Sequence, residues 1–155
     1  MLRDSIKSAQ VTAMKAGDKA RLGAVRLILA KLKDRDIELR PILSKDGSQV
    51  PDDDVLVVEV LQKMAKQRRE SMAMFEQAGR QELADAEAAE LAVIDEFMPQ
   101  QMSEAETSAA IAVIKAELGA SSVKDMGKVM AELKALHGSA LDMSKASALV
   151  KVALA

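Results

Sequence analysis

The basic residues of this chain that could bind a polyanion lie in rows. Lys19, Arg26, Lys33 and Arg40 recur every seven positions. Seven residues make nearly two turns of an α-helix, so a helical segment would place all four side chains on one face. Cations in such a row bind a phosphate backbone by releasing its counterions, with little reading of base sequence. The chemistry that this spacing predicts is electrostatic binding of a nucleic acid.

Further basic residues lie in the middle and in the last third of the chain, at intervals that would place them along the faces of helices. Lys63, Lys66 and Arg69 step by three, and Arg68 lies beside them. The candidate RNA-binding residues that we select from the rows are Lys124, Lys128, Lys134, Arg26, Lys33, Lys66 and Arg69. The chain has no Trp or Tyr and only 2 Phe, so it lacks aromatic platforms for stacking bases. Any RNA binding is therefore expected to read shape.

Each of these rows also fits an ordinary solvated helix face. Acidic residues such as Asp34, Asp36 and Glu70 lie among the cations. Charged stripes are the usual outer face of a helix, so for any single row this alternative is favoured. The choice depends on whether the fold gathers the cations or leaves them among carboxylates.

No arrangement of residues in the sequence predicts catalysis. His137 is the single histidine and is expected at the end of a helix, where a partial positive charge is favourable. Glu87, Glu90 and the pair Asp95-Glu96 lie among alanines and are expected to form a solvated face rather than an acid–base pair. No nucleophile has a recognisable base, and no metal-ligand spacing is evident. We therefore expect no catalytic residue, no metal and no cofactor.

The 7 glycines are isolated, and none is spaced as a phosphate-binding loop requires. Five of them fit turns or helix ends. Gly23 and Gly127 are expected inside helices, where each costs roughly 1 kcal/mol relative to Ala. That cost indicates either close helix packing or close approach of a partner, and packing is favoured because it is the commoner reason.

The composition predicts an all-α protein. Hydrophobic residues make up 49% of the chain and aromatic residues 1%, so the apolar mass is mainly Ala, Leu, Val, Ile and 10 Met, most of which favour helix. Cysteine is absent, which excludes disulfides and suits a reducing compartment. No apolar stretch approaches the roughly 20 residues that span a bilayer, so we expect a cytoplasmic monomer with no membrane contact.

Periodicity and capping residues place the helices. Gly17 is expected to end the first helix, Pro41 to stop the second, and Ile42 to Pro51 to form a loop with an Asp46-Gly47 turn. The run Asp52-Asp53-Asp54 is expected to cap and stabilise the start of the third helix rather than to bind calcium. Seven helices follow, at about residues 2–16, 19–39, 53–78, 81–97, 104–118, 123–137 and 143–154.

The break from Met98 to Met102 divides the chain. Residues 1–98 are predicted to form an N-terminal subdomain of four helices, two of them long, and residues 103–155 a small C-terminal three-helix bundle. Charge is uneven: residues 1–40 carry 10 Lys and Arg against 5 Asp and Glu, whereas residues 81–110 carry 8 acids and no base. A polyanion would be attracted to the first segment and repelled by the second, which could instead meet a basic partner.

Several stretches together resemble the YqeY-like proteins of the GatB/YqeY group over nearly the whole chain. They are residues 21–30 (RLGAVRLILA), 75–83 (FEQAGRQEL), 96–104 (EFMPQQMSE), 119–130 (GASSVKDMGKVM) and 149–151 (LVK). The resemblance implies a two-part helical fold. It also implies that the C-terminal part is similar to the tail domain of the B subunit of tRNA-dependent amidotransferases, which helps hold the body of the tRNA.

In this resemblance, the run from Gly127 to Met130 matches a helix of the tail, which makes Lys128 the first candidate for a phosphate contact. After Gly138 the family often has a basic residue, and this chain has Ser139. The resemblance further implies a relation to carbon–nitrogen ligases with glutamine as amido donor. Such chemistry needs an ATP site and an amidase nucleophile, and the sequence shows neither, so we read the relation as descent rather than activity.

Three hypotheses follow, in order of preference. The first is a non-catalytic tRNA-binding module related to the amidotransferases. The second is a protein–protein interaction adaptor without RNA binding, in which the 10 Met supply adaptable contacts. The third is an amidotransferase subunit or enzyme.

Overall fold

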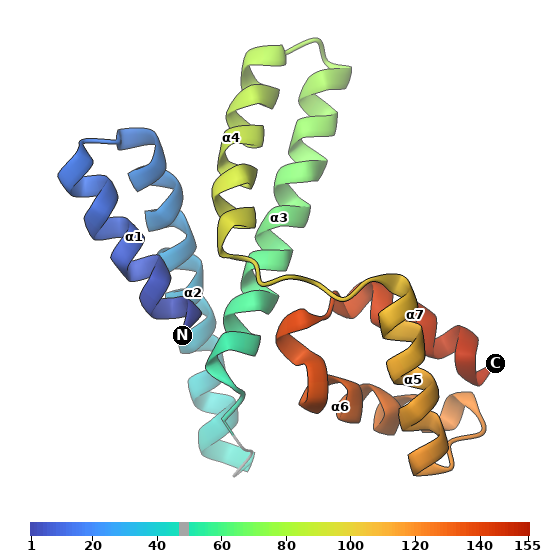
Figure 1. The fold of residues 1–155 in the computed structure, drawn as a ribbon. Coiled ribbons are helices and arrows are strands. Elements are labelled where there is room, and N and C mark those ends of the chain that lie inside the picture. The colour runs from blue at the N-terminus through green and yellow to red at the C-terminus, as the bar shows by residue number, and fades with distance from the viewer. Residues whose placement is uncertain (47–49) are drawn as a thin grey trace. The chain divides into compact units, whose positions relative to one another are not determined.

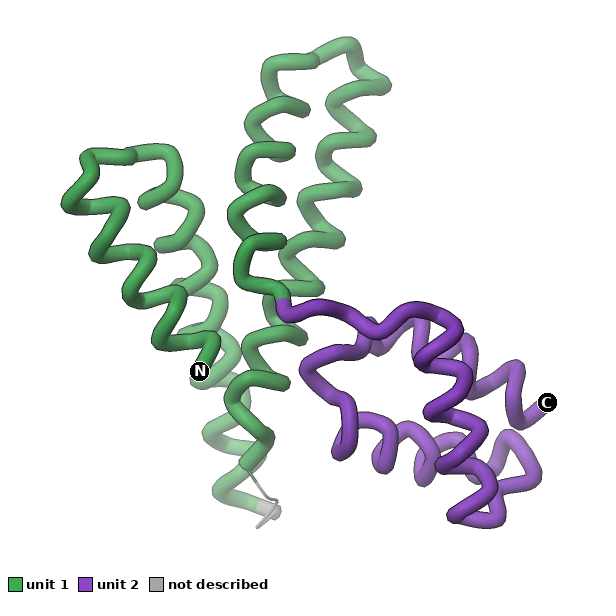
Figure 2. The backbone as a smooth tube through the Cα atoms, viewed as in Figure 1, with its two compact units in different colours: residues 1–98 green, residues 99–155 purple. Residues whose placement is uncertain are grey.

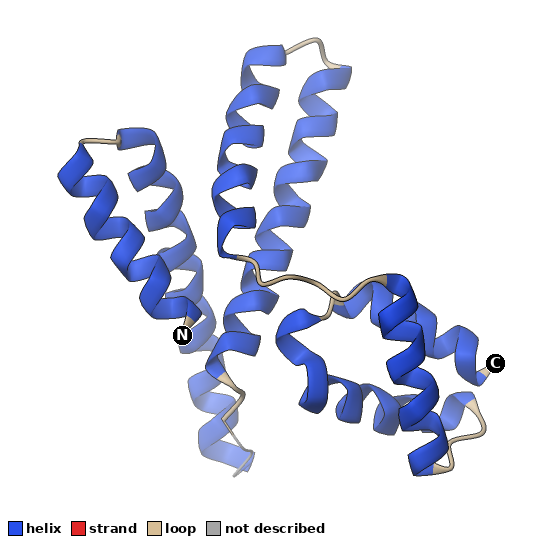
Figure 3. Ribbon diagram, viewed as in Figure 1, coloured by secondary structure: helices blue, strands red, loops and turns tan. Residues whose placement is uncertain are grey.

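The computed structural model describes residues 1–46 and 50–155, and this part of the chain consists of helices joined by turns and loops, with no strand (Figures 1 and 3). This confirms the predicted all-α class. Its elements are α1 (Leu2–Ala16), α2 (Lys19–Asp46), α3 (Asp53–Gln77), α4 (Gln81–Phe97), α5 (Glu104–Leu118), the 3-10 turn η1 (Val123–Asp125), α6 (Met126–His137), the 3-10 turn η2 (Gly138–Ala140) and α7 (Met143–Leu154). None of the described helices combines the length and apolar character needed to cross a bilayer.

The chain divides into two compact units, Met1–Met98 and Pro99–Ala155 (Figure 2). In the first unit, helices α1 to α4 surround one apolar core, in which Ile6, Val25, Leu61 and Ile94 are nearly or fully buried. The second unit has its own core, made by α5, α6 and α7 and their connections. Each unit therefore buries its apolar residues within itself, as the sequence pattern predicted for amphipathic helices.

Helix α2 is longer than predicted. Pro41 lies inside it, and the helix continues to Asp46, so the predicted stop at Pro41 is wrong. Proline removes one N–H donor, but Pro41 and Ile37, whose carbonyl loses that bond, are both exposed, and water can satisfy the carbonyl. The predicted loop is thus helical over residues 42–46, and the glycine of its Asp46-Gly47 turn lies outside the described residues.

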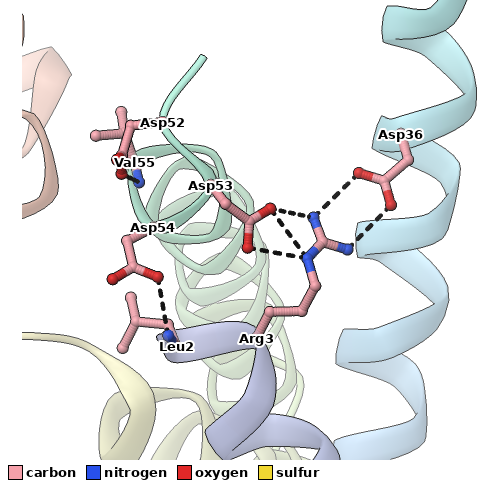
Figure 4. Close-up of polar contacts among 7 residues, drawn as sticks. All are labelled: Leu2, Arg3, Asp36, Asp52, Asp53, Asp54 and Val55. Atoms are coloured by element: carbon pink, nitrogen blue, oxygen red, sulfur yellow. Dashed lines mark hydrogen bonds and ion pairs between the residues drawn. The ribbon is translucent and has the colours of Figure 1, made fainter. Parts of the chain in front are cut away.

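The three aspartates at the start of α3 each have a separate partner (Figure 4). Asp52 is the N-cap, and its side chain accepts from the Val55 N–H at 3.2 Å. Asp54 accepts from the backbone N–H of Leu2 at 2.9 Å. Asp53 binds the guanidinium of Arg3. The predicted cap is confirmed, and the other two aspartates fasten the start of α1 to the start of α3.

Arg3 also reaches Asp36, so its side chain joins α1, α2 and α3. Its Nη1 is 3.0 Å from the Oδ2 of Asp36, and its Nη2 is 2.8 Å from the Oδ1 of Asp53. Hydrogen bonding to Asp53 raises the pKa of Arg3 above its ordinary value, burial opposes this, and hydrogen bonding to Asp36 adds to the rise. The guanidinium is therefore permanently charged and serves as a structural link.

Local capping signals define the second unit. Ser103 and Glu106 form the predicted capping box, and Gly119 ends α5 at a φ of 62°. Asp142 caps α7 by accepting from the backbone N–H groups of Ser144 and Lys145. The start of α6 differs from the prediction, because the chain after Ser122 forms η1 and α6 begins only at Met126. The Asp125 carboxylate accepts the Ser122 N–H at 3.3 Å, which holds this extra turn.

Candidate nucleic-acid interface

The cation row of α2 consists of Lys19, Arg26, Lys33 and Arg40, and all four side chains are exposed. Because α2 continues past Pro41, Arg40 lies well within the helix and not at its end. At a rise of 1.5 Å per residue, neighbours in the row are about 10.5 Å apart along the axis and the row spans about 32 Å. Each step of seven residues turns about 20° around the helix, so the four cations form a slightly slanted stripe on one side of α2.

No ion pair joins any member of this row to a carboxylate of the described residues. The nearby acids of α2 have other surroundings. Asp36 binds Arg3, and Asp34 lines a groove between α2 and α3. These acids therefore do not lie among the cations around Arg26 and Lys33, although the solvated-face alternative predicted that they would.

The groove between α2 and α3 lies on the other flank of α2. It is lined by Lys31, Asp34, Arg35 and Glu38 of α2 and by Val60, Lys63, Met64 and Gln67 of α3. Lys31 and Lys33 are two residues apart, so they point about 200° apart around the helix. Lys63 therefore lies with Lys31 and the acids of the groove, not with the cation row of α2. The fold does not merge the two rows at this point.

The predicted row on α3 is broken by ion pairs. Arg69 is 3.8 Å from Asp95 of α4, and Arg68 contacts Glu87 at 3.1 Å and Glu90 at 3.0 Å. Of the selected α3 residues, Lys66 is exposed and has no ion pair within the described part of the chain, whereas Arg69 is shared with a carboxylate. We therefore correct the prediction: among the described residues, Lys63 and Lys66 of this row have no ion pair, whereas Arg68 and Arg69 are paired with carboxylates of α4.

Several acids of α4 are partners of arginine. Glu87 is only 18% exposed, and Glu96 is 2.7 Å from Arg21 of α2. Glu90 and Asp95 are also paired with arginines. These contacts together neutralise part of the negative charge of residues 81–110. The expected solvated face is confirmed for Asp95 and Glu96, which are 52% and 50% exposed, but not for Glu87. The arginines of α2 and α3 were the signal in the sequence that could have indicated these pairs. They are far from the acids along the chain, so the sequence did not show which arginine lies opposite which acid.

The three candidate lysines of the second unit do not share one side. Lys124 lies in η1, not on α6 as predicted, because the Asp125 carboxylate organises an extra turn there. Lys128 follows on the first turn of α6, and both side chains are exposed. Lys134 is half-buried, and at six residues from Lys128 it points about 120° away. Lys124 and Lys128 thus lie four residues apart across the junction of η1 and α6, and Lys134 points elsewhere.

Asp125 lies within this pair of lysines. Backbone N–H groups of Ser121 and Ser122 donate to its carboxylate and lower its pKa, and the positive charge of Lys128 contributes in the same direction. The carboxylate therefore stays charged and is occupied by backbone donors. This turn consequently carries two exposed lysines and one carboxylate that already accepts hydrogen bonds from the backbone.

Gly23 and Gly127 are exposed, and the predicted packing explanation for them is wrong. A Cβ atom built on either glycine would have nothing within 4 Å among the described residues of its own unit. The physical reason is position: Gly23 lies beside the cation row of α2, and Gly127 lies between Lys124 and Lys128, so both face away from the cores.

A family model described as Yqey-like protein matches residues 3–154. The chain belongs to the YqeY family. The match begins within α1 and ends at the last residue of α7, so both units of this YqeY-family protein fall inside it. No curated protein matches the chain.

The remaining candidates for chemistry in this YqeY-family protein are few. His137 is half-buried at the end of α6. Among residues 1–46 and 50–155, no group of three or more Asp, Glu or His side chains is arranged to hold a metal ion. A hollow in the second unit is lined by Thr107 and Lys145, but the Thr107 hydroxyl donates to the Ser103 carbonyl at 2.8 Å.

Proposed function

We propose that this YqeY-family protein is a non-catalytic module that binds structured RNA, with tRNA as its ligand. The observation that carries the proposal is the cation row of α2, which is exposed along about six turns and has no ion pair in the described residues. A row of free cations is the electrostatic footprint of a protein that binds a phosphate backbone. Lys124 and Lys128 add a second, shorter contact in the other unit.

Two further features support structured RNA over single strands. The chain has only 2 aromatic residues, Phe75 and Phe97, and both are half-buried. Bases of a single strand would therefore find no exposed ring on which to stack. A helix face with cations at regular intervals instead suits the backbone of a duplex, which is recognised by shape and phosphate contacts.

The choice of tRNA rests on the resemblance of residues 103–155 to the tail domain of the amidotransferase B subunit. That tail holds the body of a tRNA away from the chemistry. A protein with this part and no amidotransferase site would hold tRNA without modifying it, which is the relation to glutamine-dependent amidotransferases that we propose.

The test measures tRNA binding by fluorescence anisotropy over a range of salt concentrations. Arg26→Gln combined with Lys33→Gln removes two charges from the row. Lys31→Gln combined with Lys45→Gln is the matched control, since both residues point about 100° or more away from Arg26 and Lys33 around the same helix and the charge change is equal. We expect the row variant to weaken binding and to reduce the slope of log K against log salt by about 1.5 to 2, with less change in the control.

Absence of tRNA binding by the wild-type protein at low salt would refute the proposal. Equal loss in the row variant and its control would refute the assignment to this face, because the effect would then follow net charge alone. Circular dichroism of each variant checks that the helices are intact.

A protein–protein adaptor without RNA binding is the second candidate. The observation in its favour is the exposed apolar surface near the α3–α4 turn, where Met74 is 68% and Leu83 is 41% exposed. The acidic α4 no longer supports it, since four of its carboxylates are held by arginines. Recovery of one protein in stoichiometric amount from cells, with no RNA, and its loss in Met74→Glu with Leu83→Glu would favour the adaptor.

A further inference from the structure

The cation row of α2 alternates with small or apolar side chains. Gly23, Ala30 and Ile37 fall between successive cations at steps of four and three residues, so all seven positions share one face. Gly23 and Ala30 are both exposed, and Gly23 has open space where a Cβ would lie. Along this face, the backbone of α2 is therefore accessible between charges, most of all at Gly23.

This arrangement admits a partner to the helix backbone itself. Long basic side chains can hold a phosphate at a distance from the helix, and that contact would tolerate any residue between them. A glycine in mid-helix weakens the helix, and here no neighbour within its unit uses the space. The feature therefore lacks an explanation inside the unit, and the adjacent free cations indicate the charge of the partner.

We infer that the sugar-phosphate backbone of the bound RNA lies directly against α2 at Gly23 and Ala30, with the cations on either side neutralising its phosphates. This inference rests on the proposed function and specifies its geometry. The RNA would contact the helix backbone in van der Waals range, rather than being held at the ends of flexible side chains.

Charge decides between RNA and a second copy of this chain as the occupant. Small residues seven apart also allow two helices to pack closely. A second copy packed here would bring two cation rows together, and like charges across an interface are strongly unfavourable. A phosphate backbone carries negative charge at every nucleotide, so it can meet Arg26 and Lys33 at the same time as it contacts the helix.

The second unit also has an exposed glycine near two exposed lysines, although with a different spacing. Gly127 is exposed between Lys124 and Lys128, and Ala131 is exposed one turn later. We therefore assign Gly127 the same kind of contact. Each unit can be tested in the full-length protein by its own variants, without reference to how the units are arranged.

The test introduces a large side chain on this face of α2 and, as a control, on another face of the same helix. Gly23→Leu and Ala30→Leu place a large side chain between the cations, and Ala20→Leu is the control, since Ala20 is exposed on the flank that carries Leu27 and Lys31. We expect tRNA affinity to fall about fivefold or more for the two face variants and to stay unchanged for the control. Binding is measured by anisotropy in the salt that gives half-saturation of the wild-type protein.

A second readout separates binding from folding. Gly23→Ala is expected to raise the melting temperature, because a methyl group there meets nothing and alanine favours helix. The same variant is expected to weaken tRNA binding, and Gly127→Ala to behave likewise. A more stable protein that binds less well cannot be explained by damage to the fold.

Three outcomes would overturn the inference. The first is unchanged affinity in Gly23→Leu and Ala30→Leu while Arg26→Gln with Lys33→Gln still weakens binding, in which case the proposed function survives and the close contact does not. The second is equal loss in the Ala20→Leu control. The third is absence of tRNA binding by the wild-type protein, which removes the proposed function as well.

Discussion

Arg3 of α1 and Asp53 of α3 lie 2.8 Å apart, and Arg3 is also 3.0 Å from Asp36 of α2. One side chain thus connects three helices of the first unit. The contact also frees the cation row of α2, because it occupies Asp36, one of the acids that could have neutralised it. Structural ion pairs and the candidate RNA-binding face are therefore arranged together.

The Arg3 link should contribute measurably to stability. Arg3→Gln is expected to lower the free energy of unfolding by about 1–2 kcal/mol, since hydrogen bonds to charged groups are lost and the contact is only partly exposed, with Arg3 at 20% and Asp53 at 33%. Urea denaturation followed by circular dichroism measures the change. Arg40→Gln, at an exposed position, should change stability by less than about 0.5 kcal/mol. An equal effect of both variants would contradict the assigned role.

The capping box of α5 predicts a dependence on pH. The backbone N–H of Ser103, with its side chain as a second contribution, lowers the pKa of Glu106 from 4.5. A lowered pKa in the folded chain means that the stabilisation is complete above 4.5 and is lost as pH falls through the folded value. Carbonyl NMR of Glu106 should give a titration midpoint below 4.5.

Glu106→Gln provides the control for this titration, because glutamine can keep the box without a charge. Its stability should vary less with pH in the acidic range than that of the wild-type protein. The same acidic dependence in both proteins would show that Glu106 is not its source.

Replacing Pro41, which lies within α2, should increase the stability of the protein. Pro41→Ala restores an N–H donor to the exposed end of the helix and should raise stability by about 1 kcal/mol, less than the roughly 3 kcal/mol difference for a helix interior. Thermal denaturation and the helical signal at 222 nm measure the effect. Lower stability in the alanine variant would indicate that the proline stabilises the segment that follows.

The two cores predict separable unfolding. Leu133 is fully buried in the second unit, so Leu133→Ala should cost about 2–5 kcal/mol there. Hydrogen exchange is expected to increase in α5, α6 and α7 and to stay the same in α1 to α4. Leu61→Ala, which removes a fully buried side chain from the first core, should give the reverse pattern. Increased exchange in both units with either variant would contradict this separation.

The sequence by itself determined the helical class, most helix ends and the candidate cations. These depend on residues within about four positions of one another, as in the capping box of Ser103 and Glu106 or the cap at Asp52. The error at Pro41 shows the limit of such local rules. One lost hydrogen bond near an exposed helix end is a small cost, and the remaining turns outweigh it.

Only the tertiary structure decided which charges are free. Arg68 and Arg69 looked equivalent to Lys66 in sequence, but α4 brings carboxylates to the two arginines and none to the lysine. The open space beside Gly23 likewise could not be predicted from the helical pattern, because a helical glycine looks the same in the sequence whether it packs against a neighbour or faces solvent. Pairing and openness depend on which helix lies opposite, and that is set by the burial of distant apolar residues in a common core.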